Sequence, residues 1–218
     1  MKLANVTLPA YTKTEEIINS VSHGLGIVFG IISCILLLHT ANNGNARIGT
    51  IVFSVSVVIL YSCSTLYHSM KKSDIKKLLR LLDHSTIFLL ITGTSIALTV
   101  ICVYPYNKPL AIVMSSISFI LSTVGTILTL KDHEKYKKVQ MVLYMVIGWI
   151  SVVLIYPIYK NCAEGKNIII FVIIGGIIYT IGTIFYAVGK KKKYFHCIFH
   201  FFVLSGTLLH FFGIYTAI

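Results

Sequence analysis

Three histidines, His196, His200 and His210, lie in the stretch FHCIFHFFVLSGTLLHF, which is otherwise made mostly of Phe, Leu, Ile and Val. Burying an imidazole among apolar side chains costs free energy unless the ring is paired. On a helix that turns by about 100° per residue, His196 and His200 lie about 40° apart and share one face. Two imidazoles at this spacing can bind one metal ion.

A third ligand can come from a facing helix, and His68, at the end of another apolar segment, is the best candidate. Three histidines on Zn²⁺ leave a fourth position for water, which is typical of catalytic rather than structural zinc sites. Asp83 can then hold or deprotonate that water, or orient a ligand. Ser64 lies one turn before His68 on the same face.

Further histidines have less specific patterns. His23 and His84 lie near helix starts, where ionisable residues inside a membrane are functional hypotheses by default. Taken singly, His84 and His210 are expected to be hydrogen-bonded residues of the interior. We expect His39 and His133 to be solvated, because they lie at the outer end of an apolar segment and in a charged connection.

Seven apolar segments, each near the length that crosses a bilayer as a helix, position these residues. They are residues 21–40, 48–68, 81–104, 109–130, 139–159, 168–188 and 195–216. The chain is 56% hydrophobic and 12% charged, more apolar than a soluble domain of this size could bury. No linker or internal repeat interrupts it. We therefore expect one domain over residues 1–218, an all-α membrane protein with a seven-transmembrane helix bundle.

The basic residues predict the orientation of this bundle, because cytoplasmic connections carry an excess of Lys and Arg. Fifteen of the 19 lie on one side: Lys2, Lys13, Lys71, Lys72, Lys76, Lys77, Arg80, Lys131, Lys135, Lys137, Lys138 and the four lysines at 190–193. We expect a cytoplasmic N-terminus and an extracytoplasmic C-terminus. His23, His68, Asp83, His84, His196 and His200 then all lie near the cytoplasmic ends of their helices.

The net charge of +12 falls in short connections between apolar segments, which indicates membrane topology and contact with anionic lipid headgroups. No zinc finger or RNA-binding signature is present, so we expect no nucleic-acid partner. The five cysteines show no CxxC spacing, and we expect no disulfide or cysteine–metal framework.

Four stretches carry a resemblance to a known family: EEIINSVSHGLG, SCSTLYHS, LDHSTIFLLITGT and HCIFHFFVLSGTLLHF. The chain resembles the hemolysin III family, the bacterial branch of the PAQR proteins within the CREST superfamily, over essentially its whole length. The resemblance implies Zn²⁺ held by His68, His196 and His200, with Asp83 beside the zinc-bound water and Ser64 nearby. His210 matches a histidine that is not a ligand. Glu16, Asn19 and His23 match a polar motif to which we assign no role.

Three functions follow as hypotheses. The leading one is a zinc-dependent hydrolase of a lipid amide or ester in the cytoplasmic leaflet of the bacterial inner membrane, because the resemblance implies ceramidase-like activity in some relatives. The second is a non-enzymatic sensor of membrane stress or lipid state with structural zinc. The third is a cytolysin, as the family name suggests. It is disfavoured because the first residues lack the apolar core of a cleaved signal peptide. Neither the natural lipid nor the oligomeric state follows from the sequence.

Overall fold

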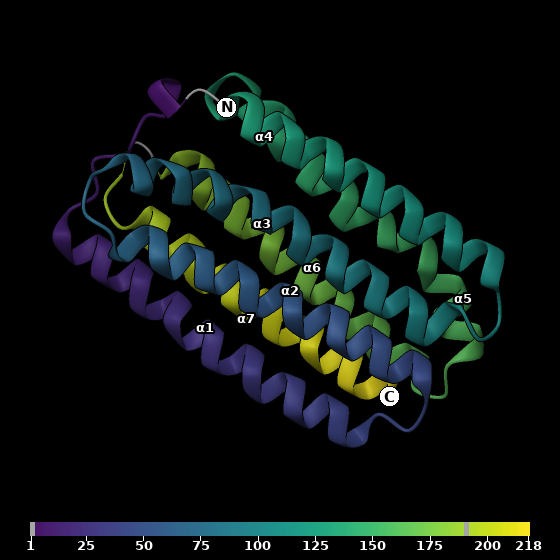
Figure 1. Cartoon of the computed structure of the whole chain (residues 1–218). Coiled ribbons are helices and arrows are strands. Elements are labelled where there is room, and N and C mark those ends of the chain that lie inside the picture. The colour runs from purple at the N-terminus through teal and green to yellow at the C-terminus, as the bar shows by residue number, and fades with distance from the viewer. Residues whose placement is uncertain (1–2, 190–191) are drawn as a thin grey trace.

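The computed structural model describes residues 3–189 and 192–218, and these residues contain helices and connecting turns but no strand. Lys2, Lys190 and Lys191, which the orientation argument counts, lie outside the described residues. The long helices run side by side along a common axis (Figure 1). Within the described ranges, six helices are long and apolar enough to cross a membrane. The chain is therefore an all-α membrane protein.

The helices follow one another with short turns between them. They are α1 (Lys13–Thr40), α2 (Gly44–Ser69), α3 (Asp74–Leu98), α4 (Lys108–Ile150), α5 (Ile155–Asn161), α6 (Gly165–Val188) and α7 (Phe195–Ala217), with the shorter turns η1 (Leu3–Asn5), η2 (Thr99–Val103) and η3 (Ser151–Leu154). α1 packs against α2 and α7, α2 against α3, α3 against α4, and α6 against α7.

The apolar pattern predicts that the first segment begins at residue 21. In the structure, α1 begins earlier, at Lys13. Thr12 caps it. The Thr12 hydroxyl accepts from the backbone N–H of Glu15, and the Glu15 carboxylate accepts from the backbone N–H of Thr12 in return. Such a capping box satisfies N–H groups that the first helical turn leaves free. The polar residues Glu16 and Asn19 therefore belong to α1.

α4 contains a break at Asp132, where φ is −163° and ψ is 91°. The sequence predicts two segments here, 109–130 and 139–159, whereas the structure has a single apolar unit over Lys108–Asn161 that continues as a helix directly after the break. α5, the last part of this unit, packs against η2, which precedes the unit. The chain therefore returns to the end of the bundle from which α4 starts (Figure 1).

Apolar side chains face outward along most of the helices, and many polar side chains face inward. Large exposed apolar residues include Val21, Ile35, Val55, Phe119 and Ile184, each at least 48% exposed. Buried polar residues are frequent, particularly histidine, serine and threonine. This distribution is typical of a protein whose outer surface contacts lipid tails and whose polar groups pair inside the bundle.

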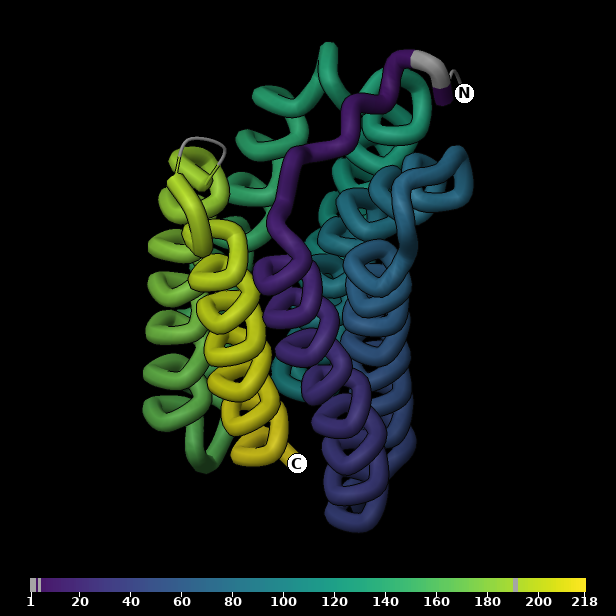
Figure 2. Tube along the Cα trace, turned by 90° about the vertical axis from the view of Figure 1, so that its left-hand side faces the viewer, coloured from purple at the N-terminus to yellow at the C-terminus, as the bar shows by residue number. Residues whose placement is uncertain are grey.

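One end of the bundle is crossed by the segment that precedes α1 (Figure 2). We call residues 6–12 the strap. Its Thr7 hydroxyl donates to the Glu134 carboxylate of α4 at 2.8 Å, and Arg80 of α3 lies 3.4 Å from the same hydroxyl. Arg80 also pairs with Glu134 at 3.2 Å. The strap is therefore tied to the start of α3 and to α4 just after its break.

Candidate metal centre

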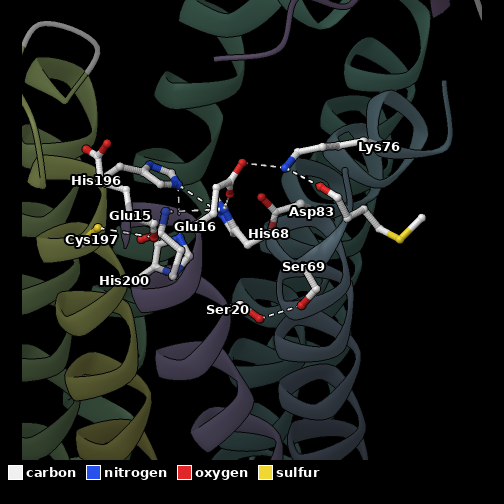
Figure 3. Close-up of polar contacts among 12 residues, drawn as sticks. Glu15, Glu16, Ser20, His68, Ser69, Lys76, Asp83, His196, Cys197 and His200 are labelled. Atoms are coloured by element: carbon white, nitrogen blue, oxygen red, sulfur yellow. Dashed lines mark hydrogen bonds and ion pairs between the residues drawn. The ribbon is translucent and has the colours of Figure 1, made fainter. Parts of the chain in front are cut away.

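His68, His196 and His200 meet at the end of the bundle that the strap crosses (Figure 3). His68 lies in the last turn of α2, and the other two lie in the first turns of α7. The Nε2 atom of His196 is 3.4 Å from Nε2 of His68 and 3.1 Å from Nε2 of His200. None of the three residues is more than 6% exposed. The structure thus brings the three predicted ligands together.

The hydrogen bonds of the outer ring nitrogens determine which nitrogen faces the centre. A Glu16 carboxylate oxygen lies 2.7 Å from Nδ1 of His68, and since a carboxylate only accepts, this Nδ1 is the donor. The Ser22 hydroxyl donates to the Asn19 carbonyl at 3.0 Å, so it accepts from Nδ1 of His200, 3.5 Å away. In the neutral rings, Nε2 of His68 and of His200 therefore carries a lone pair.

Nε2 of His196 lies near both of these lone pairs, and the three nitrogens all lie within 4.8 Å of one another. Tetrahedral Zn²⁺ with Zn–N bonds of about 2.0–2.1 Å separates its ligand nitrogens by about 3.3–3.4 Å. The two nitrogen–nitrogen separations of 3.1 and 3.4 Å are close to this value. Three neutral imidazoles are also a common donor set of catalytic zinc. The residues present therefore fit a zinc ion.

Glu16 joins this centre to a lysine. Its second carboxylate oxygen lies 2.5 Å from the ammonium of Lys76, which also donates to the backbone carbonyl of Met70 at 2.9 Å (Figure 3). The side-chain amide of Asn19 lies 3.4 Å from the same His68 nitrogen that Glu16 contacts. A carboxylate of this kind orients a histidine ligand and raises its basicity. Glu16 and Asn19, unassigned from the sequence, thus contact a predicted ligand.

Two aromatic rings cover the outer faces of the α7 histidines. His23 stacks on His200, with ring centroids 3.7 Å apart and an interplanar angle of 18°. Tyr11 of the strap stacks on His196 at 4.9 Å and 18°. Burial raises the pKa of the Tyr11 phenol well above its usual range, so the ring stays neutral. Sequence reasoning missed Tyr11. Thr12 and Glu15, spaced as a capping box, were the available signal that the helix begins beside it.

Asp83 and Ser64 lie beside each other and line one cavity together with His196 and His200. The cavity has a volume of about 160 Å³, and Asp83 is 8% exposed. Away from this polar end, its lining is mostly apolar and continues to the other end of the bundle, with Leu98, Leu154 and Ile158 among the residues there. The arrangement offers a carboxylate, a hydroxyl and two imidazoles at the head of an apolar pocket.

The remaining predicted residues lie outside the three-histidine cluster. His84 donates from Nδ1 to the Arg80 carbonyl at 2.8 Å and accepts at Nε2 from the Tyr186 hydroxyl at 3.0 Å, so both of its nitrogens are occupied. His210 donates to the Val172 carbonyl at 3.2 Å. Both are hydrogen-bonded interior residues, as predicted.

The prediction for His133 was wrong. We expected a solvated side chain, but His133 is 3% exposed. Its Nδ1 lies 2.9 Å from the Gln140 side-chain oxygen, and its ring packs edge-on against His84 with centroids 4.2 Å apart. The physical reason is the return of the chain after Asp132, which brings the start of the next helical turns against α3. His39 is exposed, as expected.

Comparison with known proteins gives a consistent result. Residues 11–211 match the family described as Haemolysin-III related. The chain is 33% identical to the Hemolysin-3 homolog of Bacillus subtilis (strain 168) over 205 residues, which are 93% of each chain. It is 34% identical to Hemolysin-3 of Bacillus cereus over 202 residues, covering 91% of this chain and 89% of the relative. The human monocyte to macrophage differentiation factor is 24% identical over 211 residues, covering 92% and 83%.

Proposed function

The chain belongs to the haemolysin III family, and from this premise we propose that it is a zinc-dependent hydrolase of a lipid amide or ester in the cytoplasmic leaflet of a bacterial inner membrane. One observation carries the proposal: three imidazole nitrogens converge where a buried carboxylate and an apolar cavity meet. Separate observations support the proposed membrane topology, the proposed metal and the proposed substrate.

The topology that we propose has seven crossings with the N-terminus inside. The return of the chain after the break at Asp132 supports two crossings within the Lys108–Asn161 unit, because each half then spans the bundle once. The lysines around the break, Lys131, Lys135, Lys137 and Lys138, favour a cytoplasmic position for it. In this orientation the three histidines lie in the cytoplasmic leaflet.

His68, His196 and His200 would hold the zinc ion, which supplies polarisation of a carbonyl and a bound water of lowered pKa. The Asp83 carboxylate, which lines the same cavity, accepts the proton of the attacking water and later returns it to the leaving group. Ser64 of the neighbouring helix lines the same cavity as this carboxylate. Glu16 keeps the proton of His68 on Nδ1, away from the centre.

The shape of the cavity supports a lipid as the substrate. Its polar end offers groups that can position a carbonyl, and its mostly apolar lining suits an acyl chain. Such a substrate reaches the cavity from the membrane, and its scissile bond lies just below the headgroups. An amide or ester at this depth meets the histidine centre while its chain occupies the apolar part.

A second candidate function is a sensor of lipid state with structural zinc. The covering of the centre by Tyr11 and His23 favours it, since structural zinc sites are closed whereas catalytic ones keep an open position. We rank it second because Asp83 and the cavity have no role in it.

The test uses purified protein and two measurements. We expect about one zinc per chain, as a three-histidine site requires, and zinc-dependent turnover of a fluorescent lipid amide or ester. His200→Ala should lose both, and the matched control His210→Ala should keep both. Zinc without turnover of either lipid would favour the sensor, and absence of zinc from the wild-type protein would contradict both functions.

A further inference from the structure

Two cysteines meet at the end of the bundle opposite the histidines. Cys102 lies in η2, after the end of α3, and Cys162 directly follows α5. The Cys162 thiol donates to the backbone oxygen of Cys102 at 3.7 Å, so the two cysteines are direct neighbours. The pair is 60 residues apart in the chain, a separation that no short cysteine motif reveals.

The two thiols differ in accessibility. Cys102 is 1% exposed, in a π-helical turn whose Tyr104 N–H donates to the Thr99 carbonyl at 2.9 Å. Turns of this type are frequent at functional sites. Cys162 is half-buried. Its N–H donates to the Ile158 carbonyl, and its own carbonyl accepts from the Gly165 N–H, each at 3.0 Å. An oxidant can therefore reach the thiol of Cys162, and the buried Cys102 lies next to it.

We propose that Cys102 and Cys162 are a redox-active pair that closes to a disulfide joining η2 to the turn between α5 and α6. Two S–H bonds break and one S–S bond forms. The two protons and two electrons pass to the disulfide of an extracytoplasmic thiol oxidant, which becomes a dithiol. The oxidant first forms a mixed disulfide with Cys162, and the Cys102 thiolate then displaces it.

The chemistry of the pair agrees with this order of events. The hydrogen bond from Cys102 lowers the pKa of the Cys162 thiol. A lowered pKa increases the fraction of thiolate, the species that attacks a disulfide. The pair does not depend on the proposed zinc chemistry. In the proposed orientation it lies on the extracytoplasmic side, where disulfides form and persist.

The disulfide would act on the far end of the apolar cavity. Leu98 of α3, Leu154 and Ile158 line that end, and they flank η2 and the turn that carries Cys162. Joining these segments restrains the relative motion of α3 and the α5–α6 turn. The oxidised protein should therefore hold this end of the cavity more rigidly than the reduced protein.

The experiment treats the purified full chain with the thiol oxidant diamide, unfolds it and alkylates the remaining thiols. We expect three of the five cysteines to be alkylated, and a Cys102–Cys162 linked peptide in mass spectrometry. The oxidised protein should also melt at least about 5 °C higher than the reduced one, because a disulfide across a long loop restricts the unfolded chain.

Variants identify the pair. In Cys102→Ser and in Cys162→Ser, all four remaining cysteines should be alkylated. In the matched control Cys34→Ser, only two of the four remaining cysteines should be alkylated, because the other two form the disulfide. Alkylation of all five wild-type cysteines after diamide treatment, or a linkage between two chains or to another cysteine, would overturn the proposal.

Discussion

At the scale of single residues, Glu16 contacts both a buried lysine and one of the three histidines of the centre. Its carboxylate lies between the Nδ1 of His68 and the ammonium of Lys76, which is only 4% exposed. A buried ammonium is costly to leave unpaired. Glu16 therefore stabilises Lys76 and at the same time holds the proton of His68 on the nitrogen that faces away from the centre.

We expect Glu16→Gln to weaken zinc binding by about 10–100-fold, the usual effect of removing such a partner of a histidine ligand. The amide keeps the size of the side chain but loses the charge that orients His68 and pairs with Lys76. The measurement is zinc affinity by competition with a chelator. Glu164→Gln is the matched control, because Glu164 is exposed and bonds to Asn167. Equal affinities of the two variants would remove Glu16 from the centre.

Asp83 separates the enzyme from the sensor. If its carboxylate is the base, Asp83→Asn should lower lipid hydrolysis by about 10²–10⁴-fold, the usual contribution of positioned acid–base catalysis, with zinc content unchanged. If it only orients a ligand, the same variant should lose zinc affinity or thermal stability. Zinc content, melting temperature and turnover are measured on one preparation. Wild-type values for all three would exclude Asp83 from both roles.

At the scale of elements, the strap closes the centre on the side away from the cavity. Thr7 ties it to α3 and α4, and the capping box at Thr12 ties it to α1. Between these anchors Tyr11 stacks on His196 and tilts toward His68, with ring centroids 5.8 Å apart. The strap would therefore limit how easily water and chelators reach the three histidines from this side.

We expect Tyr11→Ala to release zinc to a chelator faster, by up to about tenfold, since an aromatic pair contributes about 0.5–1.5 kcal/mol beyond its buried area. Tyr11→Phe keeps the stacked ring and should release zinc at the wild-type rate. The rates are followed with a coloured chelator in excess. Unchanged release from Tyr11→Ala would mean that the strap does not cover the centre.

Helix periodicity explains which elements and ligands the sequence could predict. The angle between His196 and His200 around the helix axis depends only on the geometry of one helix. Their common face therefore follows from their spacing in the sequence. The contact between Glu16 and His68 depends on how α1 and α2 are rotated against each other, and this rotation is set by packing over the whole interface. Spacing along the chain does not contain it.

The connection after residue 130 shows a second limit of the pattern. Its many charges predict a solvated loop, yet the backbone leaves helical geometry only at Asp132 and then resumes it. The charged residues on one face remain outside, while His133 and Gln140 point inward and hydrogen-bond to each other. A charge-rich segment can therefore be an amphipathic helix start, and this is why the burial of His133 was not predicted.

At the scale of the whole molecule, the apolar exterior and polar interior are understandable only in a bilayer. The outer faces of the helices carry large apolar side chains, and buried hydroxyls bond within the bundle, as in the pair Ser95 and Ser118 at 3.0 Å. The histidine centre and the cysteine pair lie at opposite ends of this bundle. Their compartments therefore depend on how many times the chain crosses the membrane and in which direction.

The number of crossings can be tested because an odd and an even number place the two ends of the chain differently. With seven crossings and a cytoplasmic N-terminus, a reporter after Ile218 should be extracytoplasmic. With the six long helices each crossing once, it should be cytoplasmic. A reporter inserted after Asp132, at the break in α4, should be cytoplasmic, and one inserted after Ala163 should be extracytoplasmic, since each half of the Lys108–Asn161 unit then crosses once. Paired enzymatic reporters active only inside or only outside the cell measure each position. The reversed pattern would place the histidine centre in the outer leaflet and the cysteine pair in the cytoplasm, where thiols are kept reduced.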